Sequence, residues 1–236
     1  MNCLLTGGTG IVGSHIMFEW LYKAIVEKTV NHLYVITRDN KKTAQQRISA
    51  ILQHPSRPEF LNAFSLEACL EKITVISQDL TTITKETLEN YNFNTVIHCA
   101  GSTSLLHTND SKTKVHLQNY LVTKQLIEQL PEAVNRFLYI STAYSFGIQN
   151  EKVSDTIENY EVNNFRNPYE QSKYESERFV KEICKKKGID AQILRPSIIC
   201  GRLIDKPLFE TPKYDVFYSW PMFLAKYANK SIENFR

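Results

Sequence analysis

TGGTGIVG, at residues 6–13, is the stretch of sequence that decides the fold of this chain. Gly7, Gly10 and Gly13 follow a short apolar run and open an amphipathic segment, so they join a predicted strand to a predicted helix. In a dinucleotide-binding loop the first glycine permits a tight turn, the second lets the backbone approach a pyrophosphate, and the third lets the helix pack closely. Four of the chain's 8 glycines lie in this stretch, which favours a nucleotide site over a tight turn that binds no ligand.

Short apolar runs alternate with longer amphipathic segments along the chain, a pattern that predicts βαβ units and a parallel sheet. We expect strands at residues 2–6, 32–37, 73–77, 95–99, 136–141 and 191–194. We expect helices at residues 11–27, 43–53, 81–90, 111–129, 168–187 and 221–228, a loop with a short helix at 54–70, and a polar loop at 149–167. These elements predict the α/β class, with a Rossmann-type doubly wound parallel sheet that carries helices on both faces.

The chain divides into two unequal parts. All the predicted strands lie in residues 1–201, which we expect to form an NADP(H)-binding Rossmann domain that carries the catalytic residues. Residues 202–236 would begin a C-terminal substrate-binding lobe that is either small or truncated.

The composition argues against several other classes of protein. The net charge is only +3 and there is no basic tract, so nothing indicates nucleic-acid binding. The 5 cysteines form no CxxC pair and no metal-like cluster, which favours reduced thiols and no metal site. No apolar run approaches the roughly 20 residues that span a bilayer, and the glycine loop begins too early to follow a signal peptide. We therefore expect a cytoplasmic protein without a transmembrane segment.

The glycine loop is expected to hold the pyrophosphate of a dinucleotide through its backbone. The N-terminus of the helix that follows offers free N–H groups and a partial positive charge to the phosphates. The cofactor-binding residues predicted in this stretch are Gly7, Thr9, Gly10, Ile11, Val12 and Gly13.

The end of the second predicted strand should determine which dinucleotide binds. An acidic residue there accepts from the ribose 2′-OH of NAD(H), whereas an arginine suits the 2′-phosphate of NADP(H). Both types are present, as Arg38 and Asp39, and Arg47 in the next predicted helix could add a second cation. We favour NADP(H) bound by Arg38 and Arg47. NAD(H) is the alternative if Asp39 contacts the ribose, and the arginines could also be solvated surface residues.

Asp79 and Leu80 follow the third predicted strand and are also expected to contact the cofactor. A carboxylate at this place could accept a hydrogen bond from the adenine amino group. The same carboxylate could instead cap the predicted helix at residues 81–90, and the two roles are compatible.

Tyr169 and Lys173 form a Tyr-xxx-Lys pair that points to proton transfer. Four residues apart on a helix, they share one face, so the ammonium should stabilise the phenolate and lower the pKa of the tyrosine. Such a tyrosine can exchange a proton with a carbonyl or an alcohol. Tyr120 and Lys124 have the same spacing, so position must decide. Tyr169 begins the helix after the fifth strand, whose carboxyl end carries Thr142, and binding sites of open parallel sheets lie at such ends.

Six motifs, in this order along the chain, resemble those of the extended short-chain dehydrogenases/reductases. They are TGGTGIVG, VIHCAG (96–101), Asn119, STAYSFG (141–147), YEQSK (169–173) and LRPSIICG (194–201). Within that superfamily the chain looks most like the fatty acyl-CoA reductase and thioester-reductase branch, the male sterility type of NAD(P)-binding domain. The cues are Arg38, Arg47, the STAY signature and RPSII. The resemblance covers about residues 1–201 and implies an NAD(P)-dependent oxidoreductase.

The resemblance implies a role for each matching residue. Tyr169 would be the proton donor, and Lys173 would lower its pKa and hold the nicotinamide ribose. Thr142 would hydrogen-bond the reacting carbonyl, and Asn119 would support the site. The alternatives are that Thr142 is a strand-end hydroxyl that bonds backbone and that Asn119 faces solvent. His98 would be structural, and further cofactor contacts would come from Ala100, Gly101, Ser102, Pro196 and Ser197.

The leading hypothesis for the function is NADP(H)-dependent reduction of an acyl thioester, on CoA or a carrier protein, or of the derived aldehyde. The first alternative is an NAD(P)-dependent sugar-nucleotide epimerase or dehydratase. The second is a non-catalytic NADP-binding regulatory protein. The expected partner is therefore a small-molecule or carrier-bound acyl substrate, and a homodimer is compatible with these features.

Overall fold

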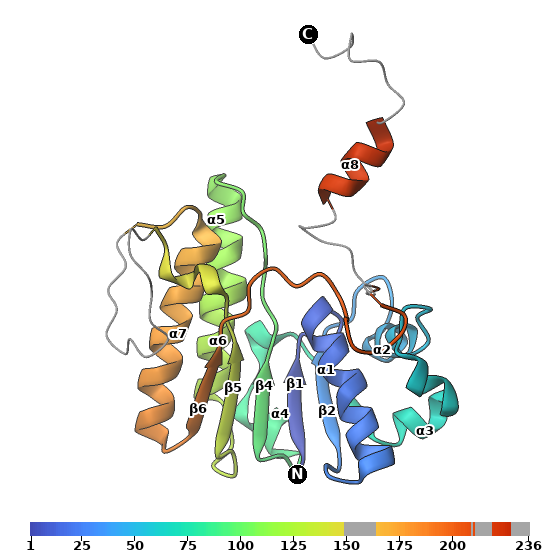
Figure 1. Cartoon of the computed structure of the whole chain (residues 1–236). Coiled ribbons are helices and arrows are strands. Elements are labelled where there is room, and N and C mark those ends of the chain that lie inside the picture. Colours follow the sequence, from blue (N-terminus) through green and yellow to red (C-terminus); the bar gives the residue numbers. More distant parts are fainter. Residues whose placement is uncertain (149–163, 209, 211–218, 228–236) are drawn as a thin grey trace.

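The computed structural model describes residues 1–148, 164–208, 210 and 219–227. Its centre is a parallel sheet of 6 strands in the order β3-β2-β1-β4-β5-β6 (Figure 1). The strands are β1 (Cys3–Thr6), β2 (Leu33–Thr37), β3 (Ile73–Ser77), β4 (Thr95–His98), β5 (Arg136–Ile140) and β6 (Asp190–Leu194). Each predicted strand is confirmed, and the predicted ends differ from the observed ends by one residue at most.

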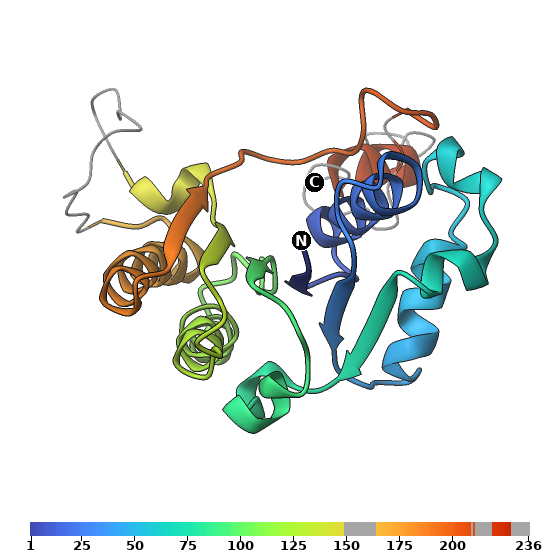
Figure 2. The same ribbon diagram turned by 90° about the horizontal axis from the view of Figure 1, so that it is seen from below.

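Helices lie on both faces of the sheet, as the doubly wound class requires (Figures 1 and 2). The helices on one face are α1 (Ile11–Tyr22), α2 (Ala44–Leu52) and α3 (Leu66–Leu70). Those of the other face are α4 (Lys85–Glu89), α5 (Asn109–His116), α6 (Val122–Glu128) and α7 (Pro168–Lys187). A last helix, α8 (Ser219–Tyr227), follows the sheet. Among the described residues, none of these helices is both long and apolar enough to cross a membrane.

Three predicted helices differ from a continuous α-helix. The one predicted at residues 81–90 is a 3-10 turn followed by the short α4, and the other two contain π-helical turns. A π-helical turn, η1 (Lys23–Glu27), follows α1, and a second, η4 (Leu117–Leu121), separates α5 from α6. The apolar spacing of the sequence predicts the helix but not a one-residue bulge within it, because the bulge keeps the same side-chain types on the buried face. Short 3-10 turns form η2 (Glu59–Ala63), η3 (Leu80–Thr82) and η5 (Ala143–Phe146). Most of the predicted polar loop at 149–167 lies outside the described residues.

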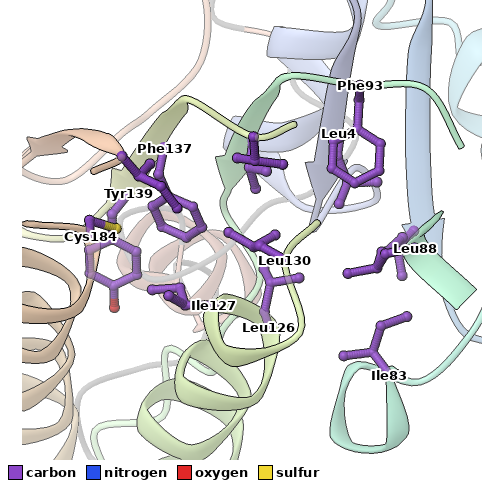
Figure 3. Packing of buried hydrophobic residues seen from close by; sticks show 14 of the residues in the cluster. Leu4, Ile83, Leu88, Phe93, Leu126, Ile127, Leu130, Phe137, Tyr139 and Cys184 are labelled. Carbon is purple, nitrogen blue, oxygen red and sulfur yellow. The ribbon is translucent and has the colours of Figure 1, made fainter. Parts of the chain in front are cut away.

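The core consists of two layers, one on each face of the sheet. Alternate residues of β1 point to opposite faces, so Leu4 packs in one cluster and Leu5 in the other. Figure 3 shows the first cluster, where Leu4 lies with Phe93 above Leu126 and Leu130. Each fully buried leucine contributes roughly 1.5–3 kcal/mol, and the central strands β1 and β2 are accordingly almost entirely buried and mostly apolar.

The strand order places one crevice at the carboxyl edge of the sheet. β1 pairs with β2 on one side and with β4 on the other, so the chain leaves the middle of the sheet in two directions. Ligands of open α/β sheets bind where the strand order reverses in this way. Each strand's carboxyl end lies on the same edge, so the glycine loop, residues 99–102, residues 141–142 and residues 195–197 are brought together there.

Helix α7 has clear sequence signals at both ends. Asn167 caps its N-terminus by accepting from the N–H of Glu170 at 3.0 Å, and Pro168 occupies the first turn. Gly188 ends it in the left-handed conformation, with a φ of 67°. These caps fix where the helix starts, and therefore place Tyr169 in its first turn.

Candidate functional site

A cavity of about 470 Å³ opens at the carboxyl edge of the sheet. This volume is in the range of small-molecule sites. Five separate segments line it: the glycine loop, the stretch after β4, the end of β5, the start of α7 and the stretch after β6. The predicted site residues among its lining are Gly7, Gly10, Ile11, Val12, Gly13, Gly101, Ser102, Thr142, Tyr169, Lys173, Pro196 and Ser197.

The glycine loop has no room for side chains. Gly7 has a φ of +73°, and a Cβ on it would lie 2.7 Å from the backbone nitrogen of Ala100. A Cβ on Gly13 would lie 2.2 Å from the carbonyl oxygen of Gly7. Gly10 is the N-cap of α1 and supplies no side-chain cap, so the first N–H groups of the helix are left for another acceptor. The loop therefore fits the pyrophosphate of a dinucleotide.

Thr142 and Tyr169 both line the cavity wall. The Oγ1 of Thr142 accepts from the backbone N–H of Tyr144 at 3.3 Å, so the backbone-bonding alternative for this hydroxyl is present, and the same hydroxyl lies near enough to the phenol of Tyr169 to affect its pKa. Thr142 comes directly after β5, and Tyr169 comes from the first turn of α7. Lys173, one turn further along α7, is buried and donates from its Nζ to the carbonyl oxygen of Ile140 at 2.6 Å. The same ammonium lies 4.3 Å from the centre of the Tyr139 ring. The three predicted groups thus converge, as the positional argument requires.

Lys173 lowers the pKa of Tyr169 as expected, but the net shift is upward. Burial of Tyr169 raises its pKa above the ordinary value, because the phenolate would lose its hydration. The charge of Lys173 and the nearby hydroxyl of Thr142 both lower the pKa of Tyr169, but they compensate for only part of that cost. A phenol in this state keeps its proton at neutral pH, which suits a proton donor.

Asn119 is buried behind the cavity and holds two segments together. Its Oδ1 accepts from the backbone N–H of Ser102 at 2.6 Å, and its Nδ2 donates to the carbonyl oxygen of Ser102 at 3.1 Å. Nδ2 also donates to the Oγ of Ser172 at 2.8 Å, and that hydroxyl donates to the carbonyl oxygen of Tyr169 at 2.8 Å. The solvent-facing alternative for Asn119 is therefore excluded. Its contacts connect the stretch after β4 to the helix that carries Tyr169.

Arg47 lies at the far end of the glycine loop and connects it to β2. One of its terminal nitrogens donates to the Oγ1 of Thr9 at 3.0 Å. The other donates to the Oγ1 of Thr37 at 2.8 Å and to the carbonyl oxygen of Arg38 at 2.7 Å. This places a guanidinium beside the end of β2, where the adenosine ribose of a dinucleotide lies in this fold.

The neighbouring carboxylates are already engaged. Asp39 accepts from the N–H of Ala44 at 2.6 Å and from Ser77 Oγ at 2.8 Å, and these two bonds hold the pKa of Asp39 below its usual range. Asp79 caps η3 by accepting from the N–H of Thr81 at 2.9 Å, which lowers the pKa of Asp79. Its second oxygen lies 3.3 Å from Arg38 Nη1. Asp79 does cap the turn that follows β3, but the cap of the helix in the predicted range 81–90 is Thr84, because α4 begins only at Lys85. The adenine contact of Asp79 stays a prediction.

Several predicted residues do not line the cavity. Leu80 packs against the core, and Ala100 donates its N–H to Thr6. The others outside the lining are Thr9, Arg38, Arg47, Asp79 and Asn119. The second Tyr-xxx-Lys pair lies elsewhere: Tyr120 packs on the ring of Phe179, and Lys124 pairs with Glu128 on the outside of α6.

Sequence reasoning missed some residues of the site. Ser172 lies inside the YEQSK motif, and only its buried partners reveal its role. Glu170, Arg166, Ile198 and Ile199 also line the cavity. The apolar pair could have been found from its place in RPSII, next to residues already predicted to border the nicotinamide.

The fold and the site together define an NAD(P)-binding domain of the extended short-chain dehydrogenase/reductase type. A family model described as "Male sterility protein", an NAD-binding family, matches residues 5–233. The chain belongs to this family, and the resemblance inferred from its motifs is confirmed.

Known proteins similar to this chain include epimerases and reductase domains. The UDP-glucose 4-epimerase of Haemophilus influenzae is 28% identical over 187 residues, which are 78% of this chain and 49% of that protein. A thiolation-reductase di-domain of an archaeal non-ribosomal peptide synthetase has a TM-score of 0.71 at 20% identity, over 95% of this chain and 58% of that one. The terminal R domain of the myxalamid PKS-NRPS biosynthetic pathway has a TM-score of 0.64 at 22% identity, over 83% and 49%. The chain spans about half the length of the curated relatives that it matches.

Proposed function

We propose that this chain is the cofactor-binding and catalytic part of an NADP(H)-dependent reductase. Its substrate would be an acyl thioester, carried by CoA or by a carrier protein, or the aldehyde derived from it. The observation that carries the proposal is the convergence of Thr142, Tyr169 and Lys173 in a cavity that also contains the glycine loop. Two hydroxyl groups then face one carbonyl oxygen beside a dinucleotide.

The roles of the chain's own groups follow from their protonation and contacts. The bound dinucleotide would supply the hydride to the carbonyl carbon. Tyr169, whose phenol is neutral, would give its proton to the carbonyl oxygen, and Thr142 would hold that oxygen by a hydrogen bond. Lys173 keeps a positive charge beside the phenol, which favours the phenolate left after proton transfer. Asn119 and Ser172 hold the helix turn that carries the tyrosine.

The choice of NADP(H) over NAD(H) rests on the end of β2. The carboxylate of Asp39 accepts from the N–H of Ala44 at the start of α2 and from Ser77, so its use for a ribose hydroxyl would cost these contacts. Arg47 and Arg38 instead present cations there, and a guanidinium suits a 2′-phosphate. We therefore assign Arg47 and Arg38 to the phosphate that distinguishes NADP(H).

NADPH oxidation by the whole protein, measured against a panel of acyl thioesters and aldehydes, tests the proposal. Tyr169→Phe should abolish turnover and keep cofactor binding, because only the proton donor is removed. Tyr120→Phe is the matched control, since that ring packs against Phe179 of α7, does not line the cavity and should be dispensable. Full activity of Tyr169→Phe would contradict the assignment.

A second candidate is a sugar-nucleotide epimerase, which the similarity to UDP-glucose 4-epimerases favours. Such an enzyme would keep the same proton-transfer groups but act on an alcohol of a nucleotide sugar. Incubation of the whole protein with UDP-glucose and NAD discriminates the two. Formation of the 4-epimer without net cofactor turnover would favour the epimerase. A preference for NADP(H) over NAD(H) that is lost in Arg47→Ala would favour the reductase.

A further inference from the structure

His98 lies at the centre of a hydrogen-bonded chain that the proposed reaction does not use. The residue ends β4, is fully buried, and stacks on the ring of Tyr139. Its Nδ1 is 2.6 Å from the Oγ1 of Thr6, and its Nε2 is 2.9 Å from the Oγ1 of Thr123. Both ring nitrogens therefore have a partner within the core.

The partners determine which nitrogen carries the proton. The hydroxyl of Thr123 donates to the carbonyl oxygen of Asn119 at 2.5 Å, so its oxygen can only accept from His98 Nε2–H. The Oγ1 of Thr6 accepts from the N–H of Ala100 at 3.1 Å, which leaves its own proton for His98 Nδ1. All donors and acceptors are then matched by one neutral tautomer. Burial, assisted by the charge of Lys173, lowers the pKa of His98 to about 3, so this tautomer persists at neutral pH.

The two ends of the chain reach different halves of the site. Thr6 is the residue before Gly7, and Ala100 is the residue that Gly7 packs against, so one end sets the glycine loop. The other end bonds the carbonyl oxygen of Asn119 within the π turn η4. That carbonyl oxygen also accepts from the backbone N–H of Val122. The hydroxyl of Thr123 therefore adds a side-chain bond across the turn to the residue whose own side chain bonds Ser102.

We propose that His98 is a positioning residue whose two ring nitrogens act separately, Nδ1 on the cofactor loop through Thr6 and Nε2 on Asn119 through Thr123. The kinetic consequence rests on the proposed function, and the structural consequence does not. A residue that only fills the core would affect both halves of the site together. When a residue makes two directed hydrogen bonds, a suitable substitution can remove one of them and keep the other.

Two variants with an amide side chain each remove one of the two hydrogen bonds. His98→Asn places its amide near the position of Nδ1, so it keeps an acceptor for Thr6 and loses the contact to Thr123. His98→Gln reaches the position of Nε2, so it keeps a donor for Thr123 and loses the acceptor for Thr6. We expect His98→Asn to lower turnover by about tenfold or more at saturating cofactor with unchanged cofactor Kd. We expect His98→Gln to raise the cofactor Kd by about tenfold and to keep turnover at saturation.

Amide hydrogen exchange reports the loss of each hydrogen bond without any measurement of turnover. The N–H of Ser102 bonds Asn119, and the N–H of Ala100 bonds Thr6, so each reports one end of the chain. Exchange of the Ser102 N–H should accelerate about tenfold in His98→Asn but not in His98→Gln. Exchange of the Ala100 N–H should accelerate about tenfold in His98→Gln but not in His98→Asn. Ring ¹⁵N shifts of the wild type should show the Nε2–H tautomer between pH 6 and 8, the range that lies well above the titration of His98.

Near-isosteric variants protect the test from misfolding. Thr123→Val should reproduce His98→Asn, and Thr6→Val should reproduce His98→Gln. Thr95→Val is the matched control, because Thr95 is buried at the opposite end of β4 and its hydroxyl donates to the Oδ1 of Asn94 at 3.3 Å, away from His98. Equal losses at Ser102 and Ala100 in both His98 variants, or an Nδ1–H tautomer in the wild type, would overturn the proposal. If the folded wild-type protein does not reduce thioesters, the proposed function is rejected. The exchange results would still test the role of His98, because they do not depend on turnover.

Discussion

Arg195 and Glu177 form a bidentate ion pair that is almost withdrawn from solvent. Arg195 Nε lies 3.0 and 3.1 Å from the two carboxylate oxygens, and Nη2 lies 2.8 Å from one of them. The guanidinium also lies 4.9 Å from the centre of the Phe146 ring. Glu177 is on α7, Phe146 is in η5, and Arg195 directly follows β6. The pair therefore joins the three segments that carry the Tyr169, Thr142 and Pro196 side of the cavity.

Removal of one partner of this pair should be strongly destabilising. Glu177→Ala leaves the Arg195 cation buried without its counter-charge, and we expect a loss of about 3–5 kcal/mol in the free energy of unfolding. The double variant Glu177→Met with Arg195→Met should lose less than Glu177→Ala alone, because no unpaired charge remains. Urea denaturation measures both. Glu182→Ala, which breaks an exposed pair with Lys186 on the same helix, should leave the midpoint unchanged. A double variant as unstable as the single one would argue that packing, not charge, dominates here.

Replacement of Arg47 should alter the choice of dinucleotide. Arg47→Ala removes a charged donor from the end of β2, and a charge-assisted hydrogen bond contributes about 1.5–3 kcal/mol. We expect NADP(H) binding to weaken by roughly tenfold to a hundredfold, with little change for NAD(H). Titration of each dinucleotide, followed by nicotinamide fluorescence or calorimetry, checks this expectation.

Two further arginines serve as comparisons for Arg47. Arg38→Ala should have the smaller effect on NADP(H), because Arg38 is exposed and shares its charge with Asp79. Arg57→Ala should have none, since Arg57 bonds Leu52 and Asn62 away from the glycine loop. Equal weakening of NAD(H) and NADP(H) in Arg47→Ala would mean that Arg47 only supports Thr9 and the loop.

Replacement by alanine should lower cofactor affinity at one glycine and stability at another. Gly13→Ala brings a Cβ to within 2.2 Å of the Gly7 carbonyl oxygen, so the loop must move and dinucleotide binding should weaken by at least about tenfold. Gly188→Ala meets open space but keeps a φ of 67°, so it should cost about 1–2 kcal/mol of stability and no cofactor affinity. Thermal melts with and without NADPH separate the two effects. Normal affinity in Gly13→Ala would show that the loop tolerates the shift.

The fold was predictable because its signals are local. Each strand is a short apolar run, and α7 carries an N-cap, a proline and a C-terminal glycine in its own sequence. The glycine loop was predictable for the same reason. The convergence of Thr142 with Tyr169 needed one more step, the rule that parallel strands end at the same edge, and the structure agrees with it.

The remaining features depend on distant residues and left no local signal. The pKa of Tyr169 is set by burial, to which segments from across the chain contribute, so the adjacent lysine was a poor guide to its direction. Asp39, the alternative residue for binding the ribose, is held by the N–H of Ala44 and by Ser77, and Ser77 belongs to another strand. The orientation of Asn119 follows from a π turn that the helical spacing does not reveal.

The buried His98 should make the folded protein sensitive to acid. Its pKa is about 3 in the folded state against an ordinary value of 6.5, because burial and Lys173 oppose the cation. Below pH 6.5 the unfolded chain therefore binds a proton that the folded chain does not, and stability rises with pH in this range. Acidification from pH 6.5 towards 3 should thus remove stability, with at most about 1.4 kcal/mol per pH unit from this one group. His98→Gln, which has no titrating group, should show a shallower slope in urea midpoints at pH 7, 5.5 and 4.5, whereas Thr95→Val should keep the wild-type slope. Identical slopes in His98→Gln and the wild type would mean that the folded protein accepts the proton on His98, and the hydrogen-bonded chain from Thr6 to Asn119 would then have to reverse its donors.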